Sequence, residues 1–294
     1  MGSEPLISVC IPSYNNEEFI GSTLDSLLKQ TYSNFEILIT DDCSTDGTIS
    51  VIKKFSDPRI RLLRNERNLG IGPNWQKALS AATGKYVKLL CGDDILYPDC
   101  LRRQVAALED PSNSAVTLAI CGCDVINDRH ELVLHRGARL RKGKIKGTQV
   151  IRHCVRWGTN FVGEPAVGLF RRNEADLSAT FDFANPYMVD MDLWAELLKR
   201  GDAFVDDASL AGFRVSSASV STKVGPRQAA YFRRFIRKIR ANPVYGVNRF
   251  DVLSGYFLSF QWGILRNLFI KFQTLKKSKP AKINHVGISH HTVL

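Results

Sequence analysis

Two adjacent carboxylates, Asp93 and Asp94, follow an apolar run at residues 86–90 that predicts a short buried strand. Gly92 suits a tight turn at this point, and Pro98 suits the first turn of a helix that follows. Carboxylates at the carboxyl end of a strand lie where α/β sheets bind ligands. Because neighbouring carboxylates repel each other, we expect them to bind a hard divalent cation that also contacts phosphates. A solvated turn that caps a helix is the alternative interpretation.

The chain before this acidic pair alternates between strand and helix patterns. Strands are predicted at residues 6–11, 35–40, 60–63 and 86–90, and a helix pattern follows each of the first three. This alternation predicts right-handed βαβ units and a mainly parallel sheet. The first strand is not followed by a Gly-x-Gly-x-x-Gly turn or a Walker loop, which argues against a dinucleotide-binding or P-loop enzyme.

The composition is that of a globular protein: 44% of its 294 residues are hydrophobic, which is enough for a substantial core. The seven cysteines include no Cys-x-x-Cys pair, and several lie in apolar runs, which indicates buried thiols in a reducing compartment. Cys121 and Cys123 have no second ligand pair at suitable spacing, so we expect no zinc site. No signal peptide or membrane-spanning run is visible, and we expect a cytoplasmic protein.

Positive charge is concentrated near the C-terminus. The net charge of the chain is +11, but residues 223–282 alone hold 14 Lys and Arg against one acid, Asp251. Four apolar residues of this segment fall on one helical face: Phe232, Phe235, Ile236 and Ile239. A basic amphipathic helix with Phe and Trp nearby suits an anionic membrane surface. A helical appendage that packs on the rest of the protein is the alternative, and nucleic-acid binding is not expected because no recognition motif is present.

Five segments occur in the order and form of a known family: SVCIPSYN at residues 8–15, QTY at 30–32, DDCSTDGT at 41–48, NLG at 68–70 and GDD at 92–94. They resemble family 2 of the inverting nucleotide-sugar glycosyltransferases, in particular those of bacterial cell-surface polysaccharides. The resemblance is dense over about the first hundred residues and thinner to about residue 215. It implies an α/β protein with the GT-A fold, which is a Rossmann-like, mainly parallel sheet flanked by helices, here with a C-terminal basic helical extension.

The same resemblance divides the chain into three parts. Residues 1–100 would be the nucleotide-sugar-binding half of the GT-A domain and residues 101–222 its acceptor-binding half. Residues 223–294 would be a basic amphipathic helical tail. Residues 130–146 are polar, basic and Gly-containing, which predicts a hairpin or a mobile loop over the cleft.

Roles in donor binding follow from the resemblance. Asp42 would accept the imide N–H of the nucleotide base, a bond that a carboxylate can strengthen with its charge. Asp94 would ligate Mn²⁺ or Mg²⁺, and Asp93 would contact the ribose or a metal-bound water. The other residues expected around the nucleotide-sugar are Pro12, Tyr14, Asn15, Glu17 and Asn68. For Asp41 and Asp46, closing a turn or capping a helix is an equal alternative.

The segment VDMDLW at residues 189–194 resembles the acidic motif of the acceptor half, with Val189 in place of the usual glutamate. Asp190 matches the general base that deprotonates the acceptor hydroxyl, although a place at a helix N-terminus would by itself explain an acid here. We expect Asp192 to face the helix surface. Glu164, in the segment NFVGEP, either contacts sugar hydroxyls or belongs to a structural turn.

These expectations describe a metal-dependent inverting glycosyltransferase that moves a sugar from a UDP- or dTDP-sugar to a saccharide acceptor. We expect a lipid-linked acceptor at the cytoplasmic face of a membrane, because the basic tail suits such a surface. A nucleotidyltransferase is the alternative enzyme, although residues 12–16 lack the Gly-rich loop of that class. A non-catalytic membrane- or polyanion-binding protein on a transferase scaffold is the other alternative, against which Asp42, Asp94 and Asp190 argue.

Overall fold

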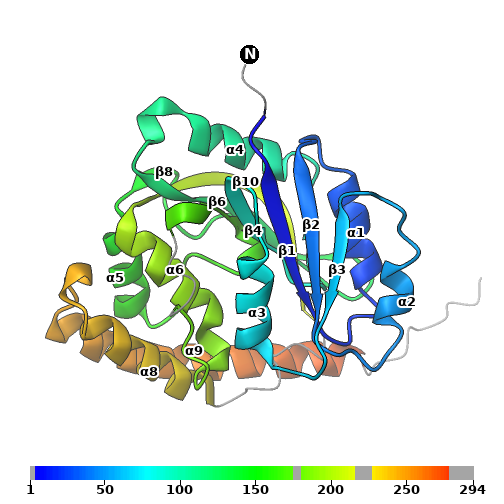
Figure 1. Cartoon of the computed structure of the whole chain (residues 1–294). Helices are drawn as coiled ribbons and strands as arrows, with labels where there is room; N and C mark the ends of the chain where they lie inside the picture. Colours follow the sequence, from blue (N-terminus) through cyan, green and yellow to red (C-terminus); the bar gives the residue numbers. More distant parts are fainter. Residues whose placement is uncertain (1–3, 175–179, 216–226, 278–294) are drawn as a thin grey trace, which may run out of the picture.

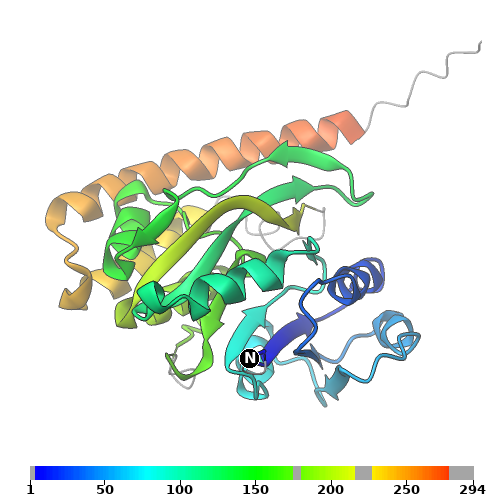
Figure 2. The same cartoon turned by 90° about the horizontal axis from the view of Figure 1, so that it is seen from above.

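The computed structural model describes residues 4–174, 180–215 and 227–277 of the chain (Figure 1). Among these residues, ten strands form one sheet. Eight of the strands run in the order β3-β2-β1-β4-β9-β6-β10-β5, while β7 pairs with β6 and β8 pairs with β10. Helices flank this sheet (Figures 1 and 2). The predicted α/β class is confirmed.

The first four strands run parallel to one another, as the alternating pattern predicts. They are β1 (Ile7–Ser13), β2 (Phe35–Asp41), β3 (Ile60–Arg64) and β4 (Tyr86–Leu89), and their connections contain α1 (Ile20–Leu28), α2 (Thr48–Ile52) and α3 (Ile71–Ser80). Every residue of β1 is buried, because this strand lies between β2 and β4 and is covered on both faces. The segments that follow these parallel strands therefore meet at one edge of the sheet.

The second half of the sheet mixes parallel and antiparallel pairs. It contains β5 (Ile95–Leu96), β6 (Val116–Ile126), β7 (Leu132–His135), β8 (Gly143–Ile145), β9 (Gly168–Arg171) and β10 (Asp202–Arg214). β9 joins the two halves, since it runs antiparallel to both β4 and β6, while β10 is parallel to β6. β6 and β7 form a hairpin, whereas β8 pairs with β10. Residues 130–146 therefore supply one strand of a hairpin but do not form the predicted hairpin by themselves, because their two strands pair with different partners.

Helices and short 3-10 turns complete the two halves. The helices are α4 (Cys100–Glu109), α5 (Gly147–Trp157) and α6 (Val189–Arg200). The 3-10 turns are Pro111–Asn113, Pro165–Val167, Arg172–Glu174, Pro186–Met188 and Pro243–Tyr245.

Lys88 is the polar exception within β4 and is fully buried. Its Nζ donates a hydrogen bond to Oε1 of Gln104 on α4 over 2.8 Å. Gln104 is also buried, and its Nε2 donates to the carbonyl oxygens of Ala119 and Val167. The buried ammonium therefore has a hydrogen-bonded partner, as burial of a polar group requires.

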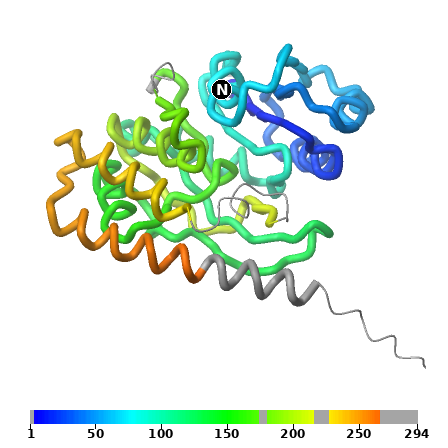
Figure 3. Tube along the Cα trace, turned by 90° about the horizontal axis from the view of Figure 1, so that it is seen from below, coloured from blue at the N-terminus to red at the C-terminus, as the bar shows by residue number. Residues whose placement is uncertain are grey.

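The C-terminal segment consists of α8 (Gln228–Arg240) and α9 (Arg249–Lys277). In α8 the predicted apolar face is buried: Phe232, Phe235, Ile236 and Ile239 are all at most 6% exposed. The expectation that Phe232 and Phe235 face a membrane is therefore wrong, because this face packs on the protein's own core. α9 crosses α8 and also packs on α5 (Figures 2 and 3).

No helix in the parts of the chain that the structure describes has the length and apolarity to cross a bilayer. The end of the predicted tail, residues 278–294, lies outside the described residues.

Candidate active site

The loops that follow β1 and β2 hold each other in place. Asn15, which has a positive φ of 51°, accepts a hydrogen bond from the N–H of Thr45 at its Oδ1 over 2.9 Å. Glu17 accepts the N–H of Gly47 at Oε2 over 2.8 Å. Tyr14 directly precedes Asn15 in the chain and is 46% exposed. These contacts bring three of the predicted donor-binding residues to the edge of the sheet at which β1 and β2 end.

Asp41 and Asp46 have structural partners in these loops. Asp41 is fully buried, and its Oδ2 accepts the N–H of Ser44 over 3.0 Å. Asp46 accepts the N–H groups of Thr48 and Glu17. These bonds close the turn that leads into α2, which favours the structural interpretation of both residues over a role in donor binding.

Asp42 links the end of β2 to the turn after β3. It is 2% exposed, and its oxygens accept hydrogen bonds from Nδ2 of Asn65 and from the N–H groups of Leu69 and Gly70 over 2.8 to 2.9 Å. Asn68, in the same turn, accepts the N–H of Gly70. A carboxylate offers about four lone-pair sites, so three bonds leave Asp42 capacity for one further donor. Pro12 is buried inside β1, one residue before the end of that strand.

Asp93 and Asp94 form a compact group with Cys91 just beyond β4. One potential ligand atom from each residue lies within 4.8 Å of the others. Burial raises the pKa of Asp94 well above its usual range, and the neighbouring charge of Asp93 raises it further. Burial also raises the pKa of Asp93. Burial therefore disfavours the negative charge of both carboxylates, and their oxygens are the ligands that Mg²⁺ and Mn²⁺ prefer.

Arg214, the last residue of β10, holds this acidic turn and had no signal in the sequence. Its backbone N–H donates to Oδ1 of Asp94 over 2.9 Å, and its Nε donates to the carbonyl oxygen of Asp93 over 2.8 Å. Its guanidinium also donates to the carbonyl oxygen of Asn127 and lies 4.6 Å from the centre of the Phe19 ring. The side chain is fully buried. Arg214 thus supplies a fixed positive charge beside both carboxylates.

Asp190 lies in the first turn of α6, on the other half of the sheet. Its Oδ2 accepts a hydrogen bond from Nδ2 of Asn160 over 2.8 Å, and its Oδ1 accepts the N–H of Met191 over 2.7 Å. Burial raises the pKa of Asp190 to about 7, although these two hydrogen bonds act to lower it. A carboxylate with a pKa near neutrality is suited to general base catalysis, because it can take a proton and release it at the operating pH.

Glu164 is held by arginines of the segment that follows β7. It forms a two-point ion pair with Arg136, and NH2 of Arg139 lies 3.6 Å from its Oε1. Burial would raise the pKa of Glu164, but the charge and hydrogen bonds of Arg136 outweigh it, and the pKa lies below its usual value. Glu164 is therefore an ionised, ion-paired residue, and its charge helps to raise the pKa of Asp190.

Cys91 marks the point where the two acidic centres meet. Burial raises the pKa of its thiol far above the usual range, and four nearby carboxylates raise it further: Asp94, Asp93, Asp190 and Glu164. The thiol therefore stays protonated and is a poor metal ligand. All four charges act on the same thiol, so the fold brings Asp190 and Glu164 near the Asp93–Asp94 turn, although Asp190 follows that turn by about a hundred positions in sequence.

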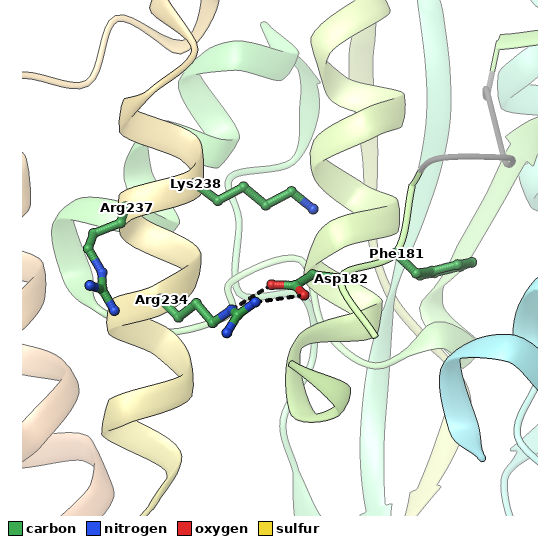
Figure 4. Close-up of a pocket in the computed structure, with 5 residues that line it drawn as sticks. All are labelled: Phe181, Asp182, Arg234, Arg237 and Lys238. Carbon is green, nitrogen blue, oxygen red and sulfur yellow. Dashed lines mark hydrogen bonds and ion pairs between the residues drawn. The ribbon is translucent and has the colours of Figure 1, made fainter. Parts of the chain in front are cut away.

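Asp192 does not face the helix surface, so this expectation is wrong. It is 2% exposed: its Oδ1 lies 2.7 Å from Nζ of Lys238 on α8, and its Oδ2 accepts the N–H of Asp182. Asp182 in turn pairs with Arg234 (Figure 4). The periodicity of α6 could not reveal this, because the partner of Asp192 comes from a helix about 45 residues later.

Five side chains line an open pocket of about 580 Å³ (Figure 4): Phe181, Asp182, Arg234, Arg237 and Lys238. None of Asp93, Asp94 or Asp190 lines this pocket. It is therefore distinct from the acidic site around Cys91, and its contacts serve mainly to attach α8 to α6.

Comparison with protein families decides the identity of the fold and its general activity. Residues 8–172 match the model of the family described as glycosyl transferase family 2. The chain belongs to this family. The match covers the loops after β1, β2 and β3, the Asp93–Asp94 turn and Glu164, but it ends before Asp190. Membership of this family identifies the chain as a glycosyltransferase. It therefore excludes the two alternatives raised by the sequence, a nucleotidyltransferase and a non-catalytic binding protein.

Two curated relatives match most of the chain. An uncharacterized protein of Mycobacterium tuberculosis, MT1568, is 34% identical over 230 residues, which cover 76% of this chain and 71% of the relative. WfgD of Escherichia coli is 29% identical over 219 residues, which cover 74% of this chain and 80% of the relative. WfgD is named as a UDP-Glc:alpha-D-GlcNAc-diphosphoundecaprenol beta-1,3-glucosyltransferase.

Solved glycosyltransferase structures share the fold. Residues 1–349 of Staphylococcus aureus TarS, in complex with UDP-GlcNAc, superpose with a TM-score of 0.61 at 18% identity, covering 80% of this chain and 66% of that chain. The mannosyltransferase PcManGT of Pyrobaculum calidifontis, in complex with GDP-Man and Mn²⁺, superposes with a TM-score of 0.57 at 17% identity, covering 94% and 76%. The GT-A glycosyltransferase fold expected from the sequence is confirmed.

Proposed function

We propose that this family 2 glycosyltransferase is metal-dependent and inverting, and that it moves a sugar from a UDP- or dTDP-sugar to a lipid-linked saccharide of a cell-surface polysaccharide. One observation carries the proposal. Two adjacent carboxylates whose pKa values burial raises, Asp93 and Asp94, act on the same thiol, that of Cys91, as does Asp190, whose pKa burial raises to about 7. A cation site and a base are the two groups that such a transfer requires.

The donor would bind along the edge formed by the loops after β1, β2 and β3. Asp42 would accept the imide N–H of uracil or thymine with its remaining lone pair. The residues that would surround the nucleotide are Pro12, Tyr14, Asn15, Glu17, Asn68 and Asp93. The names of WfgD and of the TarS complex contain UDP-sugars, which supports this donor class, whereas the GDP-Man of PcManGT makes GDP-sugars the donor that the assay must also include.

A divalent cation, Mn²⁺ or Mg²⁺, would be held by Asp94 with Asp93 beside it. When bound, it would supply positive charge to the leaving diphosphate as a Lewis acid. Arg214 fixes the Asp94 carboxylate through its backbone N–H, so the ligand would need little reorganisation. The Mn²⁺ in the PcManGT complex supports this choice of ion.

Asp190 would take the proton of the acceptor hydroxyl as that oxygen attacks the sugar. Inversion requires attack from the face opposite the diphosphate, so the base and the metal residues must come from different parts of the site. Asp190 on α6 and Asp94 after β4 meet this condition. Asn160 orients the Asp190 carboxylate through its 2.8 Å hydrogen bond.

The acceptor would be a saccharide carried on a lipid diphosphate, and the enzyme would act at the cytoplasmic face of a membrane. The name of WfgD specifies an acceptor of this type, and the basic C-terminal helices suit an anionic lipid surface.

Transfer assays with purified protein would test this function. UDP-, dTDP- and GDP-sugars would be supplied with Mn²⁺ and with lipid-diphosphate saccharides, and the released nucleotide and glycosylated lipid would be measured. We expect UDP- or dTDP-sugar turnover that chelation of the metal abolishes and that inverts the anomeric configuration. Turnover of GDP-sugars alone, or full activity in a chelator, would contradict the proposal.

A further inference from the structure

The side of α9 that faces away from the protein is strongly apolar. Five of its residues, which we call the apolar stripe, are between 46% and 69% exposed: Phe250, Leu253, Phe257, Phe260 and Ile264. They recur at intervals of three and four residues. At about 100° per residue they fall within an arc of roughly 80° on one side of the helix. Isolated exposed apolar residues are common, but a contiguous row of this size marks an interaction surface.

The opposite side of α9 attaches the helix to the protein through small and polar residues together with Val252 and Tyr256. Gly255 packs so closely on α5 that a Cβ at this position would lie 2.1 Å from the carbonyl oxygen of Val155. Asp251 is fully buried and forms ion pairs with Arg152 and Arg156 of α5 over 2.8 and 2.6 Å. The larger number of big apolar side chains is thus on the outward side, and these fixed contacts keep the apolar stripe there.

The C-terminal segment that contains the apolar stripe is rich in positive charge. Between Arg227 and Lys277 the chain has eleven Lys and Arg residues and one acid. That acid, Asp251, is buried and paired, so it adds no negative charge to the surface. Arg249 is exposed next to the start of the stripe, and the guanidinium of Arg156 lies 5.9 Å from the Phe250 ring.

We propose that the apolar stripe of α9 is a membrane-docking face that binds an anionic lipid surface. Large apolar side chains would enter the interface between headgroups and acyl chains, while the surrounding Lys and Arg attract anionic headgroups. The spacing of the stripe would also fit a coiled coil with a second copy of the chain. However, Phe occupies three of its five positions, where paired helices favour Ile, Val or Leu, and two copies would bring like charges together.

The position of α9 in the fold is compatible with membrane docking. α9 runs along the side of the molecule toward which β1 and β2 point (Figure 1), at an outer edge of the domain (Figures 2 and 3). Docking through the stripe would hold the enzyme at the lipid surface that carries its proposed acceptor. The role of membrane docking in catalysis rests on the proposed lipid-linked acceptor. The docking itself can be measured independently, because vesicle binding requires neither donor nor acceptor.

Co-sedimentation of the full chain with lipid vesicles tests the proposal. Phosphatidylcholine vesicles with and without phosphatidylglycerol would be compared. We expect binding to the anionic vesicles, at least ten-fold weaker binding to neutral vesicles, and a remainder that persists at about 1 M salt, where the Debye length is roughly 3 Å. The double variant Leu253→Ser/Phe257→Ser should lose at least ten-fold in binding, including the salt-resistant part. Arg249→Gln should weaken binding at low salt only.

Matched controls change apolar residues of similar exposure elsewhere. Val244→Ser, in the turn before α9, and Leu134→Ser, on β7, alter side chains that are 50% and 52% exposed, and we expect both to bind vesicles like the unaltered chain. Equal binding of the stripe variant would overturn the proposal. So would a dimer, measured by light scattering without lipid, that the stripe variant converts to a monomer. Melting temperatures within about 2 °C for all variants would show that the loss is not unfolding.

Discussion

The backbone N–H of Arg214 donates a hydrogen bond to Oδ1 of Asp94 over 2.9 Å, although the two residues are 120 positions apart in the chain. The Arg214 side chain turns back to the same loop and donates to the carbonyl oxygen of Asp93. The end of β10 therefore supports the acidic turn after β4 from both its main chain and its side chain. Two halves of the sheet are joined at the point where the metal would bind.

The Arg214 side chain should be essential for the stability of this turn. Arg214→Met keeps much of the buried volume but leaves the carbonyl oxygens of Asp93 and Asn127 without their donor. We expect the free energy of unfolding to fall by about 2 to 4 kcal/mol, since unsatisfied buried polar groups are costly. Urea denaturation measures this loss. Arg61→Met is the control. The Arg61 side chain forms an ion pair with Glu36 but is 54% exposed, so its replacement should change the free energy of unfolding by less than about 0.5 kcal/mol.

Asp190→Asn should separate catalysis from stability. Loss of the base should reduce turnover by about 10² to 10⁴-fold with little effect on donor affinity. The folded protein raises the pKa of Asp190 from 3.8 to about 7, so the ionised carboxylate destabilises the fold increasingly as pH rises through this range. Removing the charge should therefore raise the melting temperature by a few °C at pH 8, and much less near pH 4. A variant that is both active and less stable at pH 8 would show that Asp190 has a structural role instead.

The acid limb of the pH profile should report the same group. We expect log(kcat/KM) to rise with pH by about one unit per pH unit below pH 7 and then level off, because the base acts in its ionised form. Asn160 donates to Asp190 and lowers its pKa, so Asn160→Ala should move the limb to higher pH. Rate measurements between pH 5 and 9 would reveal the shift. A limb that stays in place would mean that another group sets it.

The sequence predicted the parallel strands and the loops at their carboxyl ends well, because these signals are local. The apolar runs of β1, β2 and β4 mark strands, and the polar segments after them, with Asp42 and Asp94, must follow at the carboxyl ends of those strands. These strands could be predicted without knowing which distant residues they contact. By contrast, Arg214 could not be recognised, because its function depends on where β10 ends relative to β4.

The C-terminal helices show a second limit of sequence patterns. Periodicity correctly placed Phe232 and Phe235 on one face of a helix, but it could not tell a membrane from the protein's own core as the partner of that face. In α9 the larger apolar residues point outward, since Gly255 and Asp251 make the contacts with α5. Likewise Asp192 is buried only because Lys238 of α8 lies opposite it. Such pairings depend on tertiary packing.

Calorimetric titration of UDP- and dTDP-sugars with Mn²⁺ tests the central claim most directly, namely that Asp93 and Asp94 form the cation site and Asp190 the base. The unaltered chain would be compared with Asp94→Asn, with Asp190→Asn, and with Asp207→Asn, a control at a 58% exposed acid. We predict that Mn²⁺-dependent donor binding is lost in Asp94→Asn but stays within about two-fold of the unaltered chain in the other two. Equal Mn²⁺-dependent affinity in Asp94→Asn and the unaltered chain would contradict the account.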